Sequence, residues 1–436
     1  MSVLIVVGVG TLLTRGNPLP VSNTPKQPAT TTTLPAIPRN TTPLQFFGMH
    51  VDYSRGPVWP SLPIGMGGFP AGAGWAYVEL QPGIYNWSPI NNYISAARSA
   101  GVTQFVYTFY ETPQWAASKP DQACFNAALS GCAAVPANIS YWDQFVNAVV
   151  MHYRGEIGYY EIWDAPNSNA YWSGNVSQLV SMAGSAYTII KADDPNATVL
   201  SPGVTAAALG QYSPTCTPVT CWLSLYLLDG GSKYADAIAF DGYPCTGQEC
   251  APGTSCTGGL GCAGAALTGE VTSLQSILSA RGIGGKPIID TYGGWGQNSQ
   301  AGSIEQQAAY ISRWYILQDS AGVKGALWYE WSTNTSASAY GSNVSAPLVA
   351  QAYVQTYDWL YNSEISPPCT LSGGIWSCYV TFKNGTQGLV LWDNSSSGSV
   401  AYQPPYSYKE YQKLNGTYAT INGIMELTYS PVMLMQ

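Results

Sequence analysis

Short apolar runs alternate with amphipathic stretches over most of the chain. Strand-like runs fall at 46–51, 103–110, 159–163, 198–201, 237–243, 287–291 and 325–331, and residues 66–71, which contain Gly and Pro, are a weaker candidate for the second strand. Helical spacing of apolar positions falls at 90–100, 141–153, 177–192, 222–229, 267–281, 304–321 and 350–360. Strands that alternate in this way with helices predict an α/β fold, the (β/α)8 TIM barrel.

The pattern changes after Pro367 to short strands separated by Gly and Asn turns, at 376–382, 388–392 and 425–429. This change predicts a small C-terminal β-sandwich packed on the barrel, which chain from the linker could complete. The predicted organisation is an apolar N-terminal segment at 1–16, a linker at 17–45, the barrel at 46–365 and the β-sandwich at 366–436.

The N-terminal segment has two interpretations. Residues 2–13 (SVLIVVGVGTLL) have the length of a signal-peptide core but lack its positively charged start, and they are too short to span a bilayer comfortably. The same residues have a strand composition, so a retained segment could pair with a neighbouring subunit and support self-assembly. Residues 17–45, rich in Pro and Thr, predict an extended linker.

Composition excludes several classes of partner. Charged residues make up 9% of the chain, against roughly 25% in ordinary soluble proteins. The net charge of -8 argues against a nucleic-acid partner, because few basic groups are available for phosphates. Only two histidines are present, which argues against a histidine-based metal site. We predict no metal and no cofactor.

Cysteines and sequons both favour a secreted or extracellular protein. The ten cysteines lie close to one another without a C-x-x-C pair, which predicts local disulfides rather than metal binding. They are Cys124, Cys132, Cys216, Cys221, Cys245, Cys250, Cys256, Cys262, Cys369 and Cys378. The N-x-S/T glycosylation candidates are Asn40, Asn86, Asn138, Asn175, Asn196, Asn334, Asn343, Asn384, Asn394 and Asn415.

The segment Tyr159–Asn167 (YYEIWDAPN) resembles the fourth strand of the clan A glycoside hydrolases, retaining (β/α)8-barrel enzymes that include families 5 and 39 and carry E-I-W-N-E-P-N there. Further similar motifs are FGMH at 47–50, GIYNW at 83–87, ETPQWA at 111–116, AFDGYP at 239–244, KPIIDTYGGWG at 286–296 and LWYEW at 327–331. The resemblance, closest to family-39-like enzymes, covers nearly all of residues 46–436.

The resemblance also implies replaced catalytic residues. In the family the Asn of the fourth strand holds the sugar 2-hydroxyl and the next Glu is the acid/base, whereas this chain has Asp164 and Ala165. The nucleophile Glu of T-E-G-G-W-G corresponds to Tyr292, and a usual His to Asp241. An Arg near the end of the second strand is replaced within residues 68–71. Since a retaining glycosidase needs two carboxyls, loss of hydrolysis is expected.

Other acidic groups could take over the chemistry. Strand alternation would place Glu161, Trp163 and Ala165 on one face, and Asp290 with Tyr292 on another, so Glu161 and Asp290 would lie one layer deeper in structural roles. Asp164 and Asp241 could serve as a displaced acid and base, and Tyr292 as a nucleophile. Glu330 is expected to be a rim residue, with catalysis as its alternative.

Aromatic residues near strand ends could stack on sugar rings. The candidates are Trp115, Trp163, Trp172, Tyr243, Trp295, Trp328 and Trp331. Trp163 and Trp328 could instead be barrel core, while Trp172 and Trp295, in loops beside Gly, are expected to be exposed. Three hypotheses follow: a carbohydrate-binding pseudoenzyme, a surface or filament subunit assembled through residues 2–13, and an O-glycosyl hydrolase with displaced catalytic groups.

Overall fold

The computed structural model describes residues 41–52, 59–205, 218–243, 267–294, 303–332, 346–394 and 398–436, and for residues 218–221 the backbone alone. These residues belong to one compact unit, Ile37–Gln436. Residues 2–13 and most of the predicted linker lie outside the described residues. At the described end of the linker, the Thr42 amide donates to Ser363 O at 2.8 Å, and its hydroxyl donates to Asp319 Oδ2 at 2.8 Å.

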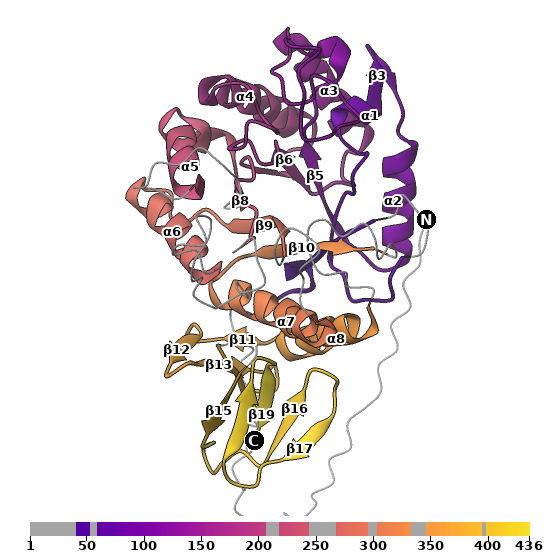
Figure 1. The fold of residues 1–436 in the computed structure, drawn as a ribbon. Helices are drawn as coiled ribbons and strands as arrows, with labels where there is room; N and C mark the ends of the chain where they lie inside the picture. The colour runs from indigo at the N-terminus through magenta and orange to yellow at the C-terminus, as the bar shows by residue number, and fades with distance from the viewer. Residues whose placement is uncertain are drawn as a thin grey trace, which may run out of the picture. The chain divides into compact units, whose positions relative to one another are not determined.

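Eight parallel strands form a nearly closed barrel (Figure 1). They are β1 Phe47–Val51, β2 Met66–Gly68, β5 Gln104–Phe109, β6 Tyr159–Ile162, β7 Thr198–Leu200, β8 Ile238–Phe240, β9 Ile288–Gly293 and β10 Gly325–Trp331. Their order is β7-β6-β5-β2-β1-β10-β9-β8, and a bridge between Leu200 and Ala237 joins the two edges. β2 is shorter than predicted, because Pro70 cannot donate to a sheet ladder.

Helices follow the strands and cover the barrel. They are α1 Trp75–Val78, α2 Ser88–Ser99, α3 Ile139–His152, α4 Val176–Asp193, α5 Pro218–Leu228, α6 Leu267–Ala280, α7 Ile304–Ser320 and α8 Pro347–Leu360, with 3-10 turns η1 Leu44–Phe46, η2 Gln114–Ala116 and η3 Gly231–Tyr234. A short hairpin, β3 Glu79–Gln81 and β4 Ile84–Tyr85, precedes α2. Asn175 and Ser303 begin α4 and α7 with capping boxes, which satisfy amides that a helix start leaves free. The predicted barrel is confirmed.

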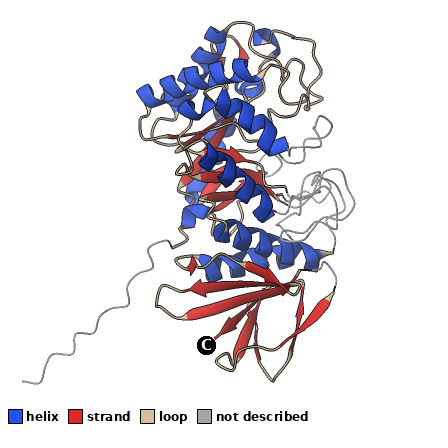
Figure 2. Ribbon diagram, turned by 90° about the vertical axis from the view of Figure 1, so that its left-hand side faces the viewer, coloured by secondary structure: helices blue, strands red, loops and turns tan. Residues whose placement is uncertain are grey.

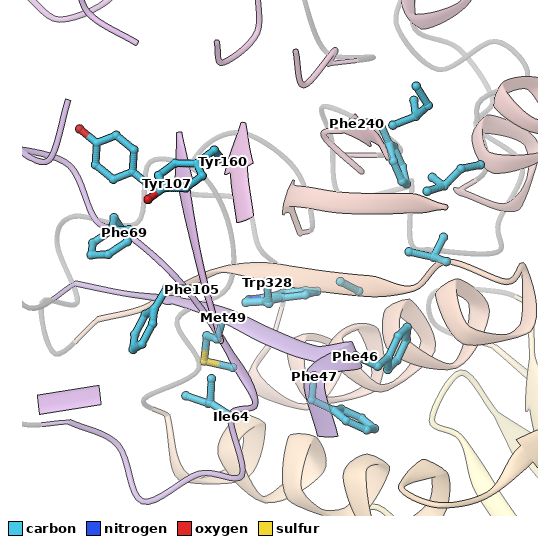
Figure 3. Close-up of a cluster of buried hydrophobic side chains, with 14 of the residues drawn as sticks. Phe46, Phe47, Met49, Ile64, Phe69, Phe105, Tyr107, Tyr160, Phe240 and Trp328 are labelled. Atoms are coloured by element: carbon cyan, nitrogen blue, oxygen red, sulfur yellow. The ribbon is translucent and has the colours of Figure 1, made fainter. Parts of the chain in front are cut away.

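The barrel has separate inner and outer cores. Outward side chains of the strands pack against the helices in a large cluster, part of which Figure 3 shows from Phe46 on η1 to Trp328 on β10. A smaller cluster fills the interior. Its buried members are Met66, Val106, Leu200, Ala237, Ala239, Ile289 and Leu327. The barrel is therefore a packed core whose interior changes to polar side chains only toward the carboxyl ends of the strands.

The C-terminal part is an antiparallel sheet domain. Its strands are β11 Glu364–Ile365, β12 Thr370–Ser372, β13 Ile375–Thr381, β14 Gln387–Asp393, β15 Ser399–Tyr402, β16 Glu410–Lys413, β17 Tyr418–Thr420, β18 Met425–Thr428 and β19 Val432–Met435. The main sheet runs β11-β13-β14-β19-β16-β17, and the separate pair β15-β18 packs against one of its faces. Helices α7 and α8 lie between this sheet and the barrel strands (Figures 1 and 2).

Arg313 of α7 ties the barrel to the sheet domain. Its side chain is fully buried, and its Nε donates to Tyr429 O at 2.7 Å while Nη2 donates to Asp393 O at 2.9 Å. The guanidinium also lies 6.0 Å from the centre of the Trp392 ring. One charged side chain therefore holds two segments of the sheet domain against α7.

Candidate functional site

A buried glutamate spans the barrel interior near the carboxyl ends of the strands. Glu161 of β6 has no exposed surface, and its two oxygens accept hydrogen bonds from Thr108 of β5 and Thr291 of β9, each at 2.7 Å. Burial raises the pKa of Glu161 to about 8, against the lowering effect of the threonines. The predicted deep position of Glu161 agrees with these contacts.

Two aspartates accompany Glu161. Asp241 follows β8 and is 2% exposed, and its Oδ1 has no hydrogen-bond partner among the described residues. A Cβ atom on Gly203 would lie 2.4 Å from Oε1 of Glu161 and 2.8 Å from Oδ1 of Asp241, so these oxygens both face the missing side chain of Gly203. Asp164, half-buried just past β6, has a pKa raised to about 7 by burial. Burial and the charges of Asp164 and Glu161 raise the pKa of Asp241 well above its usual value.

Gly203 keeps the space between these carboxyls open. We expect Gly203→Ala to destabilise the fold by about 2 kcal/mol, because the added methyl group overpacks against buried oxygens. Gly285→Ala is the matched control, since a Cβ there meets no atom within 4 Å. Urea denaturation of both variants measures the difference. Equal stability of Gly203→Ala and the unmodified chain would show that the carboxyls are not packed in this way.

The described part of the chain supplies no cation to these carboxyls. The ion pair Lys191–Asp236 involves neither Glu161 nor the two aspartates. His50 of β1 has a pKa lowered to about 4 by burial, so the ring is neutral near pH 7; its Nε2 lies 2.8 Å from Thr291 O. The segments 206–217, 244–266, 295–302 and 333–345, which follow the last four barrel strands, contain no Lys, Arg or His.

Tyr292 lies at the mouth of the barrel, which is the end where the carboxyl ends of the eight strands meet. It reaches this position because β9 contains a bulge. Asp290 pairs with Ala326 but Gly293 pairs with Trp328, so β9 has one residue more than β10 over this stretch. The Tyr292 ring stacks on His50 with centroids 4.1 Å apart, while Asp290 accepts from Gly242 N at 2.9 Å and from Gln318 of α7. The predicted common face for Asp290 and Tyr292 is therefore wrong, and Asp290 is directed toward the helix layer.

The end of β6 also departs from strand alternation. Trp163 and Ala165 have positive φ angles of 87° and 43°. This turn directs Trp163 into the outer core, where its ring lies 4.9 Å from Trp172 and 6.2 Å from Trp142 of α3. The predicted common face for Glu161 and Trp163 is wrong, because alternation ends at Ile162.

Most of the predicted stacking tryptophans are buried. Trp163 and Trp172 are 1% exposed, Trp328 is 0% and Trp331 is 7%, so none offers an open ring face. Trp172 in particular is not the exposed platform expected from its neighbouring Gly. Indole packing in the barrel's outer core accounts for these residues.

The remaining site candidates occupy varied positions. Trp115 is half-buried and donates from Nε1 to Glu79 O at 3.0 Å. Tyr243 and Glu330 are half-buried at the ends of β8 and β10, and a cis peptide bond joins Tyr329 to Glu330. Trp295 lies outside the described residues.

A row of aromatic rings beside the mouth was not predicted. Phe125 stacks on Tyr171 with centroids 4.1 Å apart and planes 1° apart, and on its other neighbour Tyr110 at 6.3 Å. Phe125 is 37% exposed. Its position directly after Cys124, inside a short disulfide loop, was the sequence signal for a fixed exposed ring.

Two of the expected disulfides are present, Cys124–Cys132 and Cys369–Cys378. Side chains of the other six cysteines lie outside the described residues. Six of the sequon asparagines are exposed: Asn86, Asn138, Asn175, Asn196, Asn384 and Asn415. Asn394 is half-buried, and its Oδ1 accepts from Trp376 Nε1 at 3.0 Å. Asn40, Asn334 and Asn343 are not described.

Three further observations concern other parts of the described structure. Where the structure is described, no three His, Cys, Asp or Glu side chains are grouped to hold a metal ion. A cavity of about 500 Å³ lies at the junction with the sheet domain, lined by residues that include Tyr361, Phe382 and Met435. None of the described helices combines the length and apolarity that a membrane crossing requires.

Known structures share this architecture. No protein-family model and no curated protein matches the chain. A family 39 glycoside hydrolase from the gut symbiont Bacteroides cellulosilyticus WH2 aligns with a TM-score of 0.67 at 16% identity, over 90% of this chain and 81% of the enzyme. A family 44 endoglucanase from Clostridium acetobutylium aligns with 0.56 at 12% identity, over 91% and 97%. A conserved exported protein from Bacteroides fragilis aligns with 0.56 at 14% identity, over 86% and 88%. At these identities the likeness establishes a glycoside-hydrolase-like fold.

Proposed function

We propose that this chain is a secreted, carbohydrate-binding pseudoenzyme that lacks retaining-glycosidase activity. By the resemblance of Tyr159–Asn167 to the hydrolase strand, the acid/base position is Ala165, whose side chain carries no proton to donate. The nucleophile position is Tyr292. Disulfides, exposed sequons and the exported structural neighbour support an extracellular location.

The residues at the two expected catalytic positions carry the proposal, because neither Ala165 nor Tyr292 supplies a carboxyl. A retaining glycosidase needs one ionised carboxylate as nucleophile and one protonated carboxyl as acid, so their pKa values must be pushed apart. Burial raises the pKa of Glu161, Asp164 and Asp241, none of which occupies either catalytic position. Burial also raises the pKa of the Tyr292 phenol well above its usual value, which leaves it protonated and a weak nucleophile.

One observation favours residual hydrolysis as a second candidate function. Oxygens of Glu161 and Asp241 both approach the Gly203 position, so two acidic groups lie near one another beneath the mouth. However, both oxygens of Glu161 already accept hydrogen bonds and the residue has no exposed surface, so a sugar would not reach it. The filament hypothesis depends on residues 2–13, outside the described part.

Aryl glycosides test the proposal. We expect the purified full chain to release no aryl alcohol from p-nitrophenyl glucosides, xylosides or mannosides above the buffer rate, and to bind members of a neutral glycan array. Asp164→Asn and Asp241→Asn serve as matched variants. Turnover by the unmodified chain that both substitutions abolish would instead establish a glycosidase with displaced catalytic groups.

A further inference from the structure

Two of the exposed sequons have the same local structure. Asn384 lies in the turn between β13 and β14, and Asn415 lies in the turn between β16 and β17. Each Oδ1 accepts from the amide and the hydroxyl of the Thr two residues later, at 3.0 and 2.7 Å from Thr386 and at 3.1 and 2.6 Å from Thr417. In both turns the residue after the Asn is a Gly with a positive φ, 84° and 77° respectively. The Thr thus fixes the Asn side chain and leaves Nδ2, the atom to which an N-linked glycan is attached, unengaged by the Thr.

The surroundings of the two sequons differ. Asn384 is part of the lining of the cavity at the junction of the barrel and the sheet domain, whereas Asn415 is not. The volume of this junction cavity, about 500 Å³, lies within the range of about 300–1,000 Å³ found for sites that bind small molecules. The barrel side of the lining follows α8 and the other side belongs to the sheet domain. The lining consists of Tyr361, Asn362, Phe382, Lys383, Asn384, Thr386 and Met435.

The lining of the junction cavity suits a sugar. Tyr361 is 39% exposed, and its ring stacks on Tyr357 of α8 with centroids 4.9 Å apart and planes 13° apart. Because the stack holds the ring in place, Tyr361 offers a preformed apolar surface of the kind that packs on a pyranose ring. Phe382 and Met435 are half-buried against the core and add apolar surface. The ammonium group of Lys383 supplies a hydrogen-bond donor for sugar hydroxyls.

We propose that Asn384 is glycosylated and that its oligosaccharide folds back into the junction cavity, where it joins the barrel to the sheet domain. The oligosaccharide is transferred from a lipid diphosphate carrier. A bond forms between Asn384 Nδ2 and the anomeric carbon, the bond from that carbon to the phosphate oxygen breaks, the lipid diphosphate leaves, and Nδ2 gives up one proton.

Attachment at the edge of the cavity favours docking. Because Asn384 itself lines the cavity, the first sugars are tethered beside Tyr361 and Phe382, and a tethered ligand binds at a high effective concentration. Docking at this cavity does not depend on carbohydrate binding at the barrel mouth, so either can fail without the other.

Enzymatic release of the glycans tests the docking. The full chain is secreted from a yeast, which attaches high-mannose oligosaccharides, and the folded glycoprotein is treated with a peptide-N-glycosidase. Mass spectrometry of the peptides follows release at Asn384, at Asn415 as the matched control in an equivalent turn, and at the other occupied sequons. We expect release at Asn384 to be at least about tenfold slower than at the others in the folded chain, because the docked glycan is shielded, and equally fast after denaturation.

Three variants examine the role of the lining. Tyr361→Ala is expected to make release at Asn384 as fast as at Asn415. Tyr361→Phe keeps the ring and is expected to keep the slow release. Tyr418→Ala, at a 55% exposed position next to the other sequon, is the control expected to leave both rates unchanged.

Thermal unfolding measures the effect on stability. Thr386→Val and Thr417→Val each remove one glycan and one hydroxyl hydrogen bond to the Asn. In the glycosylated chain Thr386→Val is expected to lower the Tm by at least about 2 °C more than Thr417→Val, and this difference should disappear in chain made without glycans. Equal release rates at Asn384 and Asn415 in the folded chain, or an Asn384 that carries no glycan, would overturn this inference and leave the proposed function standing.

Discussion

The free energy of unfolding is expected to fall as the pH rises from about 4.5 to about 8. Burial raises the pKa of Glu111 to about 7, of Asp164 to about 7 and of Glu161 to about 8. Between the ordinary carboxyl pKa and these values these groups bind more protons in the folded chain than in the unfolded chain, so their contribution is full below pH 4 and is lost as they ionise. His50, whose pKa burial lowers to about 4, opposes this trend between about pH 4 and 6.5 but does not outweigh the three carboxyls together. Because Asp164 is partly exposed and the groups interact, we expect a total loss of at least about 3 kcal/mol.

Denaturant titrations at pH 4.5, 6 and 8 measure this slope. Glu161→Gln is expected to reduce the change of the free energy of unfolding with pH, because the amide of Gln does not ionise in this pH range. Asp236→Asn is the matched control: burial opposes ionisation of Asp236, but the hydrogen bonds from Lys191 and Val199 N outweigh burial and lower its pKa. Asp236→Asn should therefore reduce stability by the same amount at all three pH values. Stability that increases from pH 4.5 to pH 8 would contradict the buried positions of these carboxyls.

Arg313→Ala is expected to destabilise the chain by about 4 kcal/mol. The substitution removes two charge-assisted hydrogen bonds, to Tyr429 O and Asp393 O, and leaves both carbonyls without that donor beside Trp392. Thermal and denaturant unfolding measure the loss, and limited proteolysis should show earlier cleavage between the barrel and the sheet domain.

Two further substitutions serve as controls for Arg313→Ala. Arg154→Ala, at an exposed position, should change stability by no more than about 0.5 kcal/mol. Arg313→Lys keeps the charge but loses the planar fork of donors, so its stability should fall between those of the unmodified chain and Arg313→Ala. If Arg313→Ala is as stable as Arg154→Ala, Arg313 does not hold the two parts together.

Periodicity was enough to predict the fold. The apolar runs that became β1, β5, β6 and β10 are short and rich in aromatic residues, which favours strands, and the helices between them carry one apolar face. The close spacing of Cys124 with Cys132, and of Cys369 with Cys378, similarly predicted the two observed disulfides. These features depend on local sequence alone.

The details of the mouth depend on interactions that periodicity does not encode. Alternation failed at Trp163, where packing against Trp142 and Trp172 outweighs the preference for an extended backbone, and at β9, where a bulge shifts Tyr292 relative to Asp290. The Phe125–Tyr171 stack joins two loops that are distant in the sequence. The directions of side chains at strand ends, and the contacts between loops that are distant in the sequence, could therefore be found only in the three-dimensional structure.

The left-handed backbone at Ala165 constrains any other residue placed at that position. Ala165 already bears the strain of φ near 43°, of order 1–3 kcal/mol, and its site is only 5% exposed, so a longer side chain there would also need room in the surrounding packing. Its neighbour Trp163 fixes that geometry from the other side of the turn by donating to Tyr171 O. A carboxyl introduced at residue 165 would therefore inherit a left-handed backbone and a closely packed site, and its direction would be set by the neighbouring turn rather than by the side chain itself.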